Sequence, residues 1–414
     1  MKEKIAVIGL GYVGLPLALK LSEFFETIGF DSDTLRIKEL TSGLDKNGEF
    51  KSEELKTSNI SLSSNSNDLL EASTFIVTVP TPVNENHEPD LSAIENACIL
   101  VGRYLTKGSL VIFESTVFPG CTEEFCAPIL EKTSGLCHGR DFNVGYSPER
   151  INPGDRSRKI ETILKIVSGD NEESLNRVAL IYEKVIRAGL FKAESIKVAE
   201  ASKLTENIQR DVNIALMNEL SEIFERMNIR TSNVLDAANT KWNFIPFRPG
   251  LVGGHCIGVD PYYLIKAAKD MGINTPLLST SRAVNEGAVE RVIKYIRSQD
   301  TKRNKKILIM GLTFKEDCND YRNSKSLEIA RKLSNDHNIH LMDPNIDHEE
   351  KSLKSLLFVD SFQASPYDII IFAVKHKQFI NFTSEKLKEI LTPQGKLVDL
   401  TCSLNISKEE GFSL

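Results

Sequence analysis

The sequence lacks the features of a membrane, secreted or disordered protein. Its 414 residues are 41% hydrophobic and 26% charged, the mixture of an ordinary globular chain. The longest apolar runs, such as Ile369–Val374, have the length of a strand and fall far short of the ~20 residues of a membrane helix. The N-terminus passes at once into Ile5–Gly9, without the longer apolar stretch and cleavage site of a signal peptide. We therefore expect no membrane segment and a cytoplasmic location.

An excess of basic residues and a cysteine framework are also missing. The 51 basic and 57 acidic residues are spread along the chain and give a formal net charge of −6, so no basic stripe is available for nucleic acid. Seven cysteines are an odd and sparse number for a disulfide framework. The set closest to a metal site, Cys121, Cys126, Cys137 and His138, matches no common zinc spacing. We expect neither a nucleic-acid partner nor a metal.

The N-terminal part of the chain alternates between strand-like and helix-like segments. An apolar strand, Ile5–Ile8, leads into the turn Gly9–Gly14, a helical stretch through Phe25 and a second strand, Thr27–Asp31. Further strand-like segments follow at Phe75–Val79, Leu110–Glu114 and Phe142–Tyr146. Because strands that alternate with helices pair in parallel, we expect an α/β domain with a doubly wound parallel sheet over residues 1–195.

The middle of the chain has a helical pattern. From Ser195 to about Arg230, apolar residues recur at three- and four-residue steps without proline or glycine, which indicates one long helix. A second helix is expected from about Pro276 to Ser298, after the loop-rich segment Lys241–Pro261. We assign residues 196–299 to a central helical domain. The long helix is expected to form a spine and a dimer surface, although its apolar face could equally be buried within one chain.

The β pattern returns in the last part of the chain. A new strand runs into a glycine turn at Ile307–Leu312, and further strands are expected at Ile339–Pro344, Ile369–Val374 and Gly395–Asp399. We therefore expect residues 300–414 to form a second, smaller α/β domain. The predicted fold class is α/β, with two Rossmann-like parallel-sheet domains joined by the long central helix and its helical domain.

The turn after the first strand has the glycine spacing of a dinucleotide site. Gly9 permits a tight turn, Gly11 lets the backbone approach a pyrophosphate, and Gly14 allows close packing of the helix that follows. The N-terminus of that helix offers N–H groups and a positive dipole to phosphates. Asp31 ends the next strand and can accept hydrogen bonds from a ribose 2′-hydroxyl, which favours NAD over NADP. Arg36 nearby leaves NADP open.

Other polar residues follow strands of the same sheet. Thr81 and Thr116 could bond the cofactor through their hydroxyls, or they could be plain turn residues. Glu149 is either half of a surface ion pair with Arg150 or an acid/base group, and the sequence leaves both open.

A row of polar residues lies on one face of the long helix. Lys203, Asn207, Arg210 and Asp211 are spaced at helical intervals, a pattern that is usually the solvated side of a helix. A functional role for this row becomes more plausible because the chain also contains a glycine-rich segment around Cys256.

Cys256 is a candidate nucleophile. It is embedded among glycines, with Asp260 four residues on, and glycine N–H groups can line an oxyanion site. A nearby lysine would favour its thiolate. His255 is either a substrate contact or a structural residue.

Taken together, these motifs resemble the UDP-glucose/GDP-mannose dehydrogenase family over essentially the whole chain. The ordered motifs are Gly9–Gly14, Glu114–Thr116, the pair Lys203 and Asn207, Gly253–Cys256 with Asp260, and Gly311–Lys315 followed by Asp320–Ser324. Within the family, Tyr146–Gly154 and Gly254–Gly258 are similar to the branch that acts on UDP-N-acetylhexosamines in bacterial capsule and O-antigen synthesis. The resemblance implies either UDP-N-acetylglucosamine or UDP-N-acetylgalactosamine as substrate, with UDP-N-acetylmannosamine or UDP-glucose as the alternative.

The resemblance also implies a mechanism. The family oxidises the C6 hydroxyl of the sugar to a carboxylate with two hydride transfers to NAD⁺. Cys256 would form a thiohemiacetal and then a thioester, and Asp260, Glu149 and Thr116 would serve its hydrolysis. Lys203 and Asn207 would hold the oxyanion at C6.

Further contacts follow from the same resemblance. Phe314 and Lys315 would hold the UDP end of the substrate, Arg322 would reach the cofactor, and Arg210 and Arg248 would contact phosphate or the N-acetyl group. The expected cofactor contacts are Gly9, Gly11, Tyr12, Val13, Gly14, Asp31, Arg36, Thr81, Thr116 and Arg322. The expected substrate contacts are Glu149, Arg150, Lys203, Asn207, Arg210, Arg248, Gly253, His255, Phe314 and Lys315. The site is expected between the two sheet domains of at least a homodimer.

Two other functions are compatible with parts of the sequence. A β-hydroxyacid dehydrogenase shares the Rossmann domain and a helical lysine and asparagine, but it needs neither Cys256 nor residues 300–414. An NAD-binding regulatory module without catalysis would have no need to keep Cys256 and Lys203.

Overall fold

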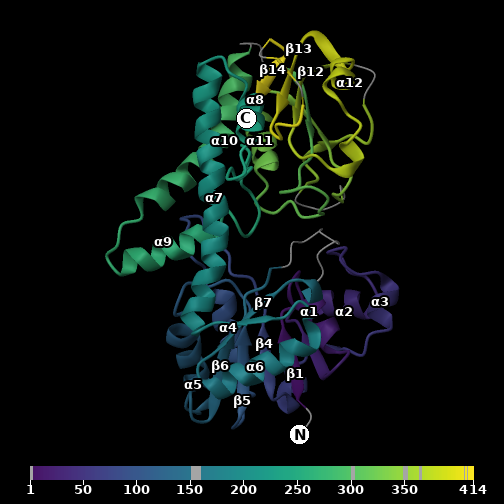
Figure 1. Ribbon diagram of the computed structural model, residues 1–414. Coiled ribbons are helices and arrows are strands. Elements are labelled where there is room, and N and C mark those ends of the chain that lie inside the picture. Colours follow the sequence, from purple (N-terminus) through teal and green to yellow (C-terminus); the bar gives the residue numbers. More distant parts are fainter. Residues whose placement is uncertain are drawn as a thin grey trace. The chain divides into compact units, whose positions relative to one another are not determined.

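The chain forms two compact units in the computed structural model, which describes residues 3–150, 160–299, 304–347, 353–362, 366–404, 406–407 and 409–414 (Figure 1). The first unit comprises Met1–Glu206 and Tyr262–Ile273. The second comprises Asn207–Pro261 and Asn274–Leu414. Residues 151–154 of the motif Tyr146–Gly154 lie outside the described residues. The boundaries of the three expected domains stay a prediction.

The described part of the first unit contains an eight-stranded sheet in the order β3-β2-β1-β4-β5-β6-β7-β8. Its strands are β1 (Lys4–Ile8), β2 (Glu26–Phe30), β3 (Ser61–Ser63), β4 (Thr74–Val77), β5 (Ser109–Phe113), β6 (Phe142–Tyr146), β7 (Lys165–Gly169) and β8 (Leu190–Lys192). Neighbouring strands are parallel, which confirms the doubly wound sheet, except that β7 runs antiparallel to β6. That reversal was not predicted.

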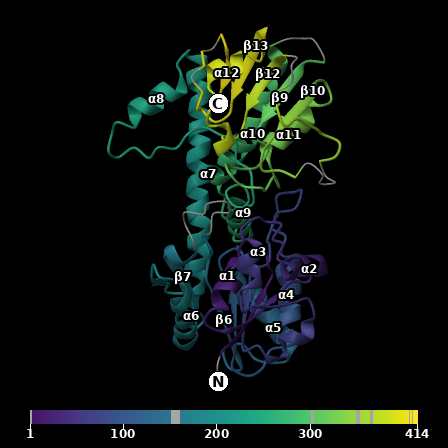
Figure 2. The same ribbon diagram turned by 90° about the vertical axis from the view of Figure 1, so that its right-hand side faces the viewer.

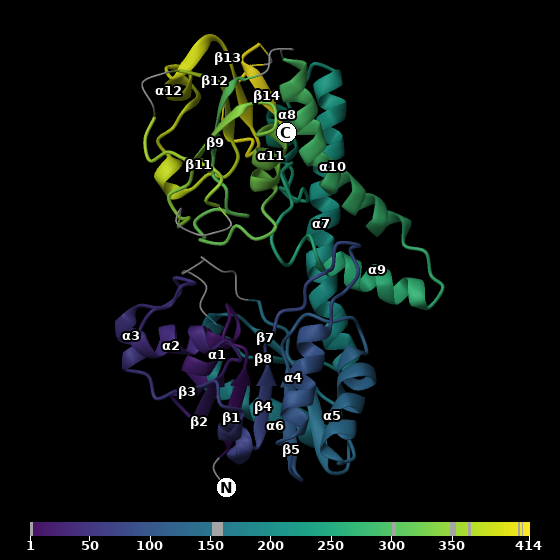
Figure 3. The same ribbon diagram turned by 180° about the vertical axis from the view of Figure 1, so that it is seen from behind.

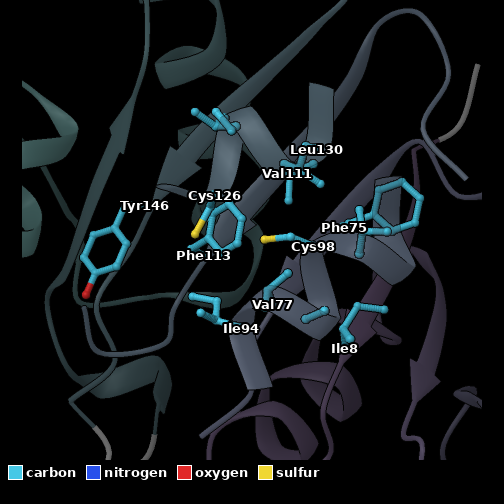
Figure 4. Close-up of a cluster of buried hydrophobic side chains, with 14 of the residues drawn as sticks. Ile8, Phe75, Val77, Ile94, Cys98, Val111, Phe113, Cys126, Leu130 and Tyr146 are labelled. Atoms are coloured by element: carbon cyan, nitrogen blue, oxygen red, sulfur yellow. The ribbon is translucent and has the colours of Figure 1, made fainter. Parts of the chain in front are cut away.

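Helices cover both faces of this sheet (Figure 2). They are α1 (Gly14–Leu21), α2 (Thr34–Ser42), α3 (Ser52–Lys56), α4 (Ser92–Gly102), α5 (Ala127–Ser134) and α6 (Glu172–Val185). Figure 4 shows the core beneath α4 and α5, where Phe75 and Val77 of β4 pack with Phe113 of β5 and Ile94 of α4. Ile76 points to the opposite core, beneath α1 and α6. The central strands are apolar on both faces because both faces are covered.

The described part of the second unit contains a six-stranded parallel sheet in the order β11-β10-β9-β12-β13-β14. Its strands are β9 (Lys306–Met310), β10 (Asn338–Met342), β11 (Leu357–Phe358), β12 (Tyr367–Phe372), β13 (Leu391–Asp399) and β14 (Gly411–Ser413). Helices α10 (Pro276–Ser298) and α11 (Lys325–Leu333) cover one face, and α12 (Ser384–Lys388) packs on the other (Figure 3). This arrangement confirms the second Rossmann-like sheet.

The predicted long helix is α7, which spans Ile196–Arg226. It ends before Asn228, whose φ of +61° belongs to the left-handed region, and α8 (Thr231–Ala238) follows. Helix α9 (Asp260–Asp270) begins four residues after Cys256 and was not predicted, because the glycines before it gave a loop pattern. None of the described helices combines the length and apolar content that a membrane span requires.

Candidate active site

The three glycines of the first turn have distinct steric roles. Gly9 has a φ of +95°, and its N–H donates to the carbonyl oxygen of Phe30 at 2.8 Å. A Cβ on Gly14, the first residue of α1, would lie 1.8 Å from the oxygen of Gly9. A Cβ on Gly11 would meet no atom within 4 Å. The turn and the helix therefore require Gly9 and Gly14, and Gly11 borders open space, as a pyrophosphate site needs. Tyr12 and Val13, half-buried, complete the turn.

The carboxylate of Asp31 organises the same turn. It accepts the N–H of Leu10 at 2.8 Å and that of Asp33 at 2.9 Å. Arg36 donates to the carbonyl oxygen of Leu10 at 3.0 and 3.1 Å and pairs with the buried Asp45 at 2.9 Å. A 2′-phosphate would have to displace this ion pair, so Arg36 gives NADP little support. Asp45 escaped the sequence analysis because it lies in an otherwise polar segment.

The two threonines expected near the cofactor lie together. The Thr81 hydroxyl donates to the carbonyl oxygen of Thr116 at 2.6 Å, and the Ser115 hydroxyl donates to that of Val79 at 2.6 Å. These bonds tie the segments after β4 and β5 at the carboxyl edge of the sheet, where ligands of open α/β folds bind.

Glu149 is buried and pairs with a residue that the sequence analysis did not single out. Its Oε2 lies 2.7 Å from Nζ of Lys165, the first residue of β7, and its Oε1 accepts the N–H of Arg150 at 2.5 Å. The Arg150 guanidinium instead pairs with Glu206 at 2.7 Å and donates to the carbonyl oxygen of Ser202 at 3.3 Å. A surface ion pair between Glu149 and Arg150 is therefore excluded.

The polar row on α7 is not a solvated face. Lys203, Asn207 and Asp211 are all buried, and Arg210 is half-buried. Within the second unit, the Asn207 amide donates to Oδ2 of Asp260 at 2.5 Å. The usual interpretation of such a row is therefore wrong for this helix.

Asp211 has a structural role. Its carboxylate pairs with the buried Arg282 of α10 at 2.5 Å and accepts from the Asn285 amide at 2.8 Å. Burial raises the pKa of Asp211, although Arg282 acts in the opposite direction. This pair joins α7 to α10.

Cys256 differs from the other cysteines by being exposed. Its carbonyl oxygen accepts the N–H groups of Val259 at 3.0 Å and Asp260 at 2.9 Å, so the thiol stands one turn before the start of α9. Cys98, Cys121 and Cys126 are buried. Contacts with the thiols of Cys121 and Cys98, together with burial, raise the pKa of Cys126 well above its usual range. An exposed thiol can reach a substrate, and these core thiols cannot.

The glycines before Cys256 are needed for packing within the protein. A Cβ on Gly253 would lie 2.7 Å from the carbonyl oxygen of Asn323, and one on Gly254 would lie 2.6 Å from the Phe314 ring. Gly254 also has a φ of +78°. The Asn323 amide donates to the carbonyl oxygen of Gly254 at 2.9 Å. The close approach to a ligand that we expected here stays a prediction, and the structure adds a close approach to Phe314 and Asn323.

His255 faces a charged pair. Its Nε2 lies 3.8 Å from Asp320, which binds the Arg322 guanidinium at 2.6 and 3.0 Å. Partial desolvation and then the charge of Arg322 lower the pKa of His255, so the imidazole is neutral at pH 7. Arg248 pairs with Asp236 at 2.6 Å, and both of these side chains are exposed.

The second unit contains a cavity of about 220 Å³ at the carboxyl ends of its strands. Gly253, Phe314 and Lys315 line it, as do Lys325 and Ser326 at the start of α11. Lys375 and Thr401 lie on its wall as well. Because Lys325 pairs with Glu286 at 2.5 Å and Glu328 at 3.2 Å, the groups that make the cavity suitable for a phosphate-bearing ligand are Lys315, Lys375 and the helix N-terminus.

The cysteine and histidine residues considered for a metal lie in different surroundings. Cys121 and Cys126 belong to the core, and Nε2 of His138 lies 2.7 Å from Asp170. Across the described ranges, no group of three or more histidine, cysteine, aspartate and glutamate residues is placed to hold a metal ion.

Three models of one family match successive parts of the chain. They are the NAD binding domain over residues 3–186, the central domain over 197–287 and the UDP binding domain over 308–405. The chain belongs to the UDP-glucose/GDP-mannose dehydrogenase family. It is an NAD-dependent UDP-sugar dehydrogenase, which confirms the resemblance and excludes a simple β-hydroxyacid dehydrogenase.

Individual relatives agree with this assignment. The chain is 46% identical to a UDP-N-acetyl-D-glucosamine 6-dehydrogenase of Pseudomonas aeruginosa, over 99% of both chains. It is 45% identical to the enzyme of that name from Salmonella typhi, over 96% of this chain and 95% of that one. Among solved structures, a UDP-D-ManNAc dehydrogenase from Pyrococcus horikoshii superposes with a TM-score of 0.87 at 29% identity, covering 99% of this chain and 98% of that one.

Proposed function

We propose that this protein oxidises the C6 hydroxyl of UDP-N-acetylglucosamine to the carboxylate, supplying a uronic acid for surface polysaccharide. The alcohol, two NAD⁺ and one water give the carboxylate, two NADH and three protons. The observation that carries the choice of sugar is the 45–46% identity, over nearly whole chains, to enzymes named for that substrate. UDP-N-acetylgalactosamine differs only at C4 and is the alternative, whereas relatives named for UDP-N-acetyl-D-mannosamine are only 31% identical.

The turn Gly9–Gly14, with Asp31, fits the dinucleotide. NAD⁺ supplies the hydride acceptor when bound. Gly11 leaves the space that the pyrophosphate needs, and the start of α1 supplies N–H groups and a positive dipole. We assign the contact with the ribose hydroxyls to Asp31. Thr81 and Thr116 are assigned contacts with the cofactor at the carboxyl edge of the sheet.

We assign the UDP pyrophosphate to the cavity of the second unit. Lys315 and Lys375 supply positive charge, and the start of α11 supplies N–H groups, whereas Lys325 pairs with Glu286 and Glu328. Phe314 forms part of the wall and supports Gly254. Arg210, Arg248 and His255 remain proposed substrate contacts, and Arg322 a proposed cofactor contact.

We assign the chemistry to Cys256 and two sets of polar groups. The Cys256 thiolate adds to the C6 aldehyde, and loss of hydride from that carbon leaves a thioester. Lys203 and Asn207 stabilise the oxyanion at C6. In the last step water attacks the thioester carbon, the C–S bond breaks to release the thiolate, and the water proton passes to Glu149. Asp260 holds Asn207 in place by their hydrogen bond, and Thr116 is assigned to the water.

We also propose a homodimer that uses the exposed side of α7. Leu216 and Ile223 of that helix are exposed, as is Met227 just beyond it. Trp242, in the loop after α8, is 96% exposed, which is unusual for so large an apolar side chain. Analytical ultracentrifugation of the full chain should give twice the mass of 46.3 kDa, and the variant Ile223→Glu should shift the species toward the monomer. A monomeric wild-type protein would contradict this.

The first experiment is NADH formation at 340 nm with NAD⁺ and each of four sugars, run to completion. The sugars are UDP-N-acetylglucosamine, UDP-N-acetylgalactosamine, UDP-N-acetylmannosamine and UDP-glucose. We expect about two NADH per UDP-N-acetylglucosamine. Two NADH with another sugar would correct the substrate, and one NADH or none with every sugar would overturn the thioester mechanism. The cytoplasmic location stays a prediction.

A further inference from the structure

A buried cluster of charged residues in the first unit contacts Glu149. Lys165 of β7 places its Nζ 2.7 Å from Oε2 of Glu149 and 3.1 Å from Oε2 of Glu114, which follows β5. The hydroxyl of Tyr182, on α6, donates to Oε1 of Glu114, and its ring lies 5.0 Å from Nζ of Lys165. We name Lys165, Glu114 and Tyr182 the Lys165 cluster. All three side chains and Glu149 are buried, with exposed fractions of 8% or less.

The Lys165 cluster retains its cation. Burial lowers the pKa of Lys165, but the charges of Glu114 and Glu149 outweigh burial, so the pKa is raised and the ammonium persists at neutral pH. Burial raises the pKa of Glu114 to about 7, even though Lys165 acts against it. Burial and the neighbouring carboxylates raise the pKa of Tyr182 well above 10, so the phenol remains a donor.

Both oxygens of the Glu149 carboxylate have defined partners. Oε2 faces the Lys165 ammonium, and Oε1 accepts the N–H of Arg150 at 2.5 Å. Among the described residues, the titratable groups that act on Glu149 include Lys165 of β7, Glu114 after β5 and Tyr182 of α6. An opposite charge within 4 Å favours the ionised form of a carboxyl group.

We propose that Lys165, held by Glu114 and Tyr182, is a positioning residue that orients Glu149 and holds its carboxylate ionised for the hydrolysis of the thioester. The inference rests on the proposed role of Glu149 in that step. Lys165 touches neither substrate nor cofactor in this account. It acts only through Glu149, so its loss should impair the last step and leave the steps before it intact.

The test compares Lys165→Met with Lys165→Arg, which keeps the positive charge. With UDP-N-acetylglucosamine and excess NAD⁺, Lys165→Met should form the thioester at the wild-type rate and then stall. Intact-protein mass spectrometry should show the acyl group on Cys256, and steady-state kcat should fall by roughly 10²–10⁴-fold, the usual contribution of a general base. The acidic limb of the kcat profile should move to higher pH, because the cation 2.7 Å from the Glu149 carboxylate is lost. Lys165→Arg should stay close to wild type in both measurements.

Two further variants make the outcome decisive. Glu149→Gln should accumulate the same acyl enzyme, and adding Lys165→Met to it should cause no further loss, because both changes disable one group. If Lys165→Met does not fold, the double variant Lys165→Met/Glu114→Gln, which removes one buried charge of each sign, takes the place of the single variant in every measurement. The inference would be overturned if Lys165→Met slowed every step equally, or if the acidic limb of its kcat profile stayed at the wild-type pH. In either case, two NADH per sugar from the wild type would still support the proposed function. A wild type that makes no NADH would overturn both.

Discussion

Replacing Gly254 by alanine should weaken the second unit and its substrate affinity together. A residue with a Cβ at the φ of +78° found here is strained by about 1–2 kcal/mol. The new Cβ would also lie 2.6 Å from Cδ2 of Phe314, so the ring must move, and such overpacking costs about 1–3 kcal/mol. The total is about 2–5 kcal/mol, or roughly 4–20 °C in the Tm of a unit of this size. Because Phe314 lines the cavity, KM for the UDP-sugar should rise as well.

Differential scanning calorimetry and initial rates of NADH formation test this reasoning. Gly258→Ala is the matched control, since its Cβ would meet nothing closer than 3.7 Å and its backbone is not left-handed. The control should change Tm by only a few degrees. The NAD⁺ affinity of Gly254→Ala should stay unchanged, because the turn Gly9–Gly14 belongs to the first unit. If Gly254→Ala matches the wild type in Tm and KM, the packing argument is refuted.

Three further predictions concern Cys256, Lys203 and His138. Cys256→Ser should fold and bind NAD⁺ with wild-type affinity but release no free uronate; normal uronate formation, measured by chromatography, would remove Cys256 from the mechanism. Lys203→Ala should lower kcat by about 10²–10³-fold with nearly unchanged NAD⁺ affinity, and a loss confined to cofactor affinity would give the lysine another role. The hydrogen bond to Asp170 raises the pKa of His138 above its unfolded value. The stability that His138 adds should therefore be complete below about pH 6.5 and be lost as the pH rises through the raised pKa. Urea unfolding of His138→Gln should show a deficit at pH 6 that shrinks at pH 8.5, and a deficit that grows with pH would reverse the sign of this argument.

Much of the fold could be predicted because it depends on local patterns. Strands such as β4 and β9 are continuous apolar runs, and α7 has an uninterrupted helical period. The strand β7, Lys165–Gly169, escaped prediction because only two of its five residues, Ile166 and Val167, are apolar, which is too short a run to stand out from a loop. Helix α9 escaped because Pro261 and the preceding glycines indicate a loop, although proline is well accepted in the first turn of a helix.

The candidate site was predictable where one segment carries the signal. The turn Gly9–Gly14 and the exposed Cys256 were found from the sequence, whereas the packing of Gly254 against Phe314 was not. The partners of buried charges were missed. Lys165 lies 16 residues from Glu149 and 51 from Glu114, and Arg36 and Asp45 meet only because the segment between them folds back. Such pairs depend on tertiary packing, which periodicity and motif spacing do not report.

The antiparallel direction of β7 has a consequence for how the site is held in place. In an all-parallel sheet, only residues that follow a strand reach the carboxyl edge, and these belong to loops. Because β7 is reversed, its first residue arrives at that edge while β8 pairs with its backbone from Lys165 to Val167. The position of Lys165 is thus set by the sheet rather than by the chain that leads into it. A cation placed in this way keeps its position relative to the carboxyl edge even if the loop before β7 moves.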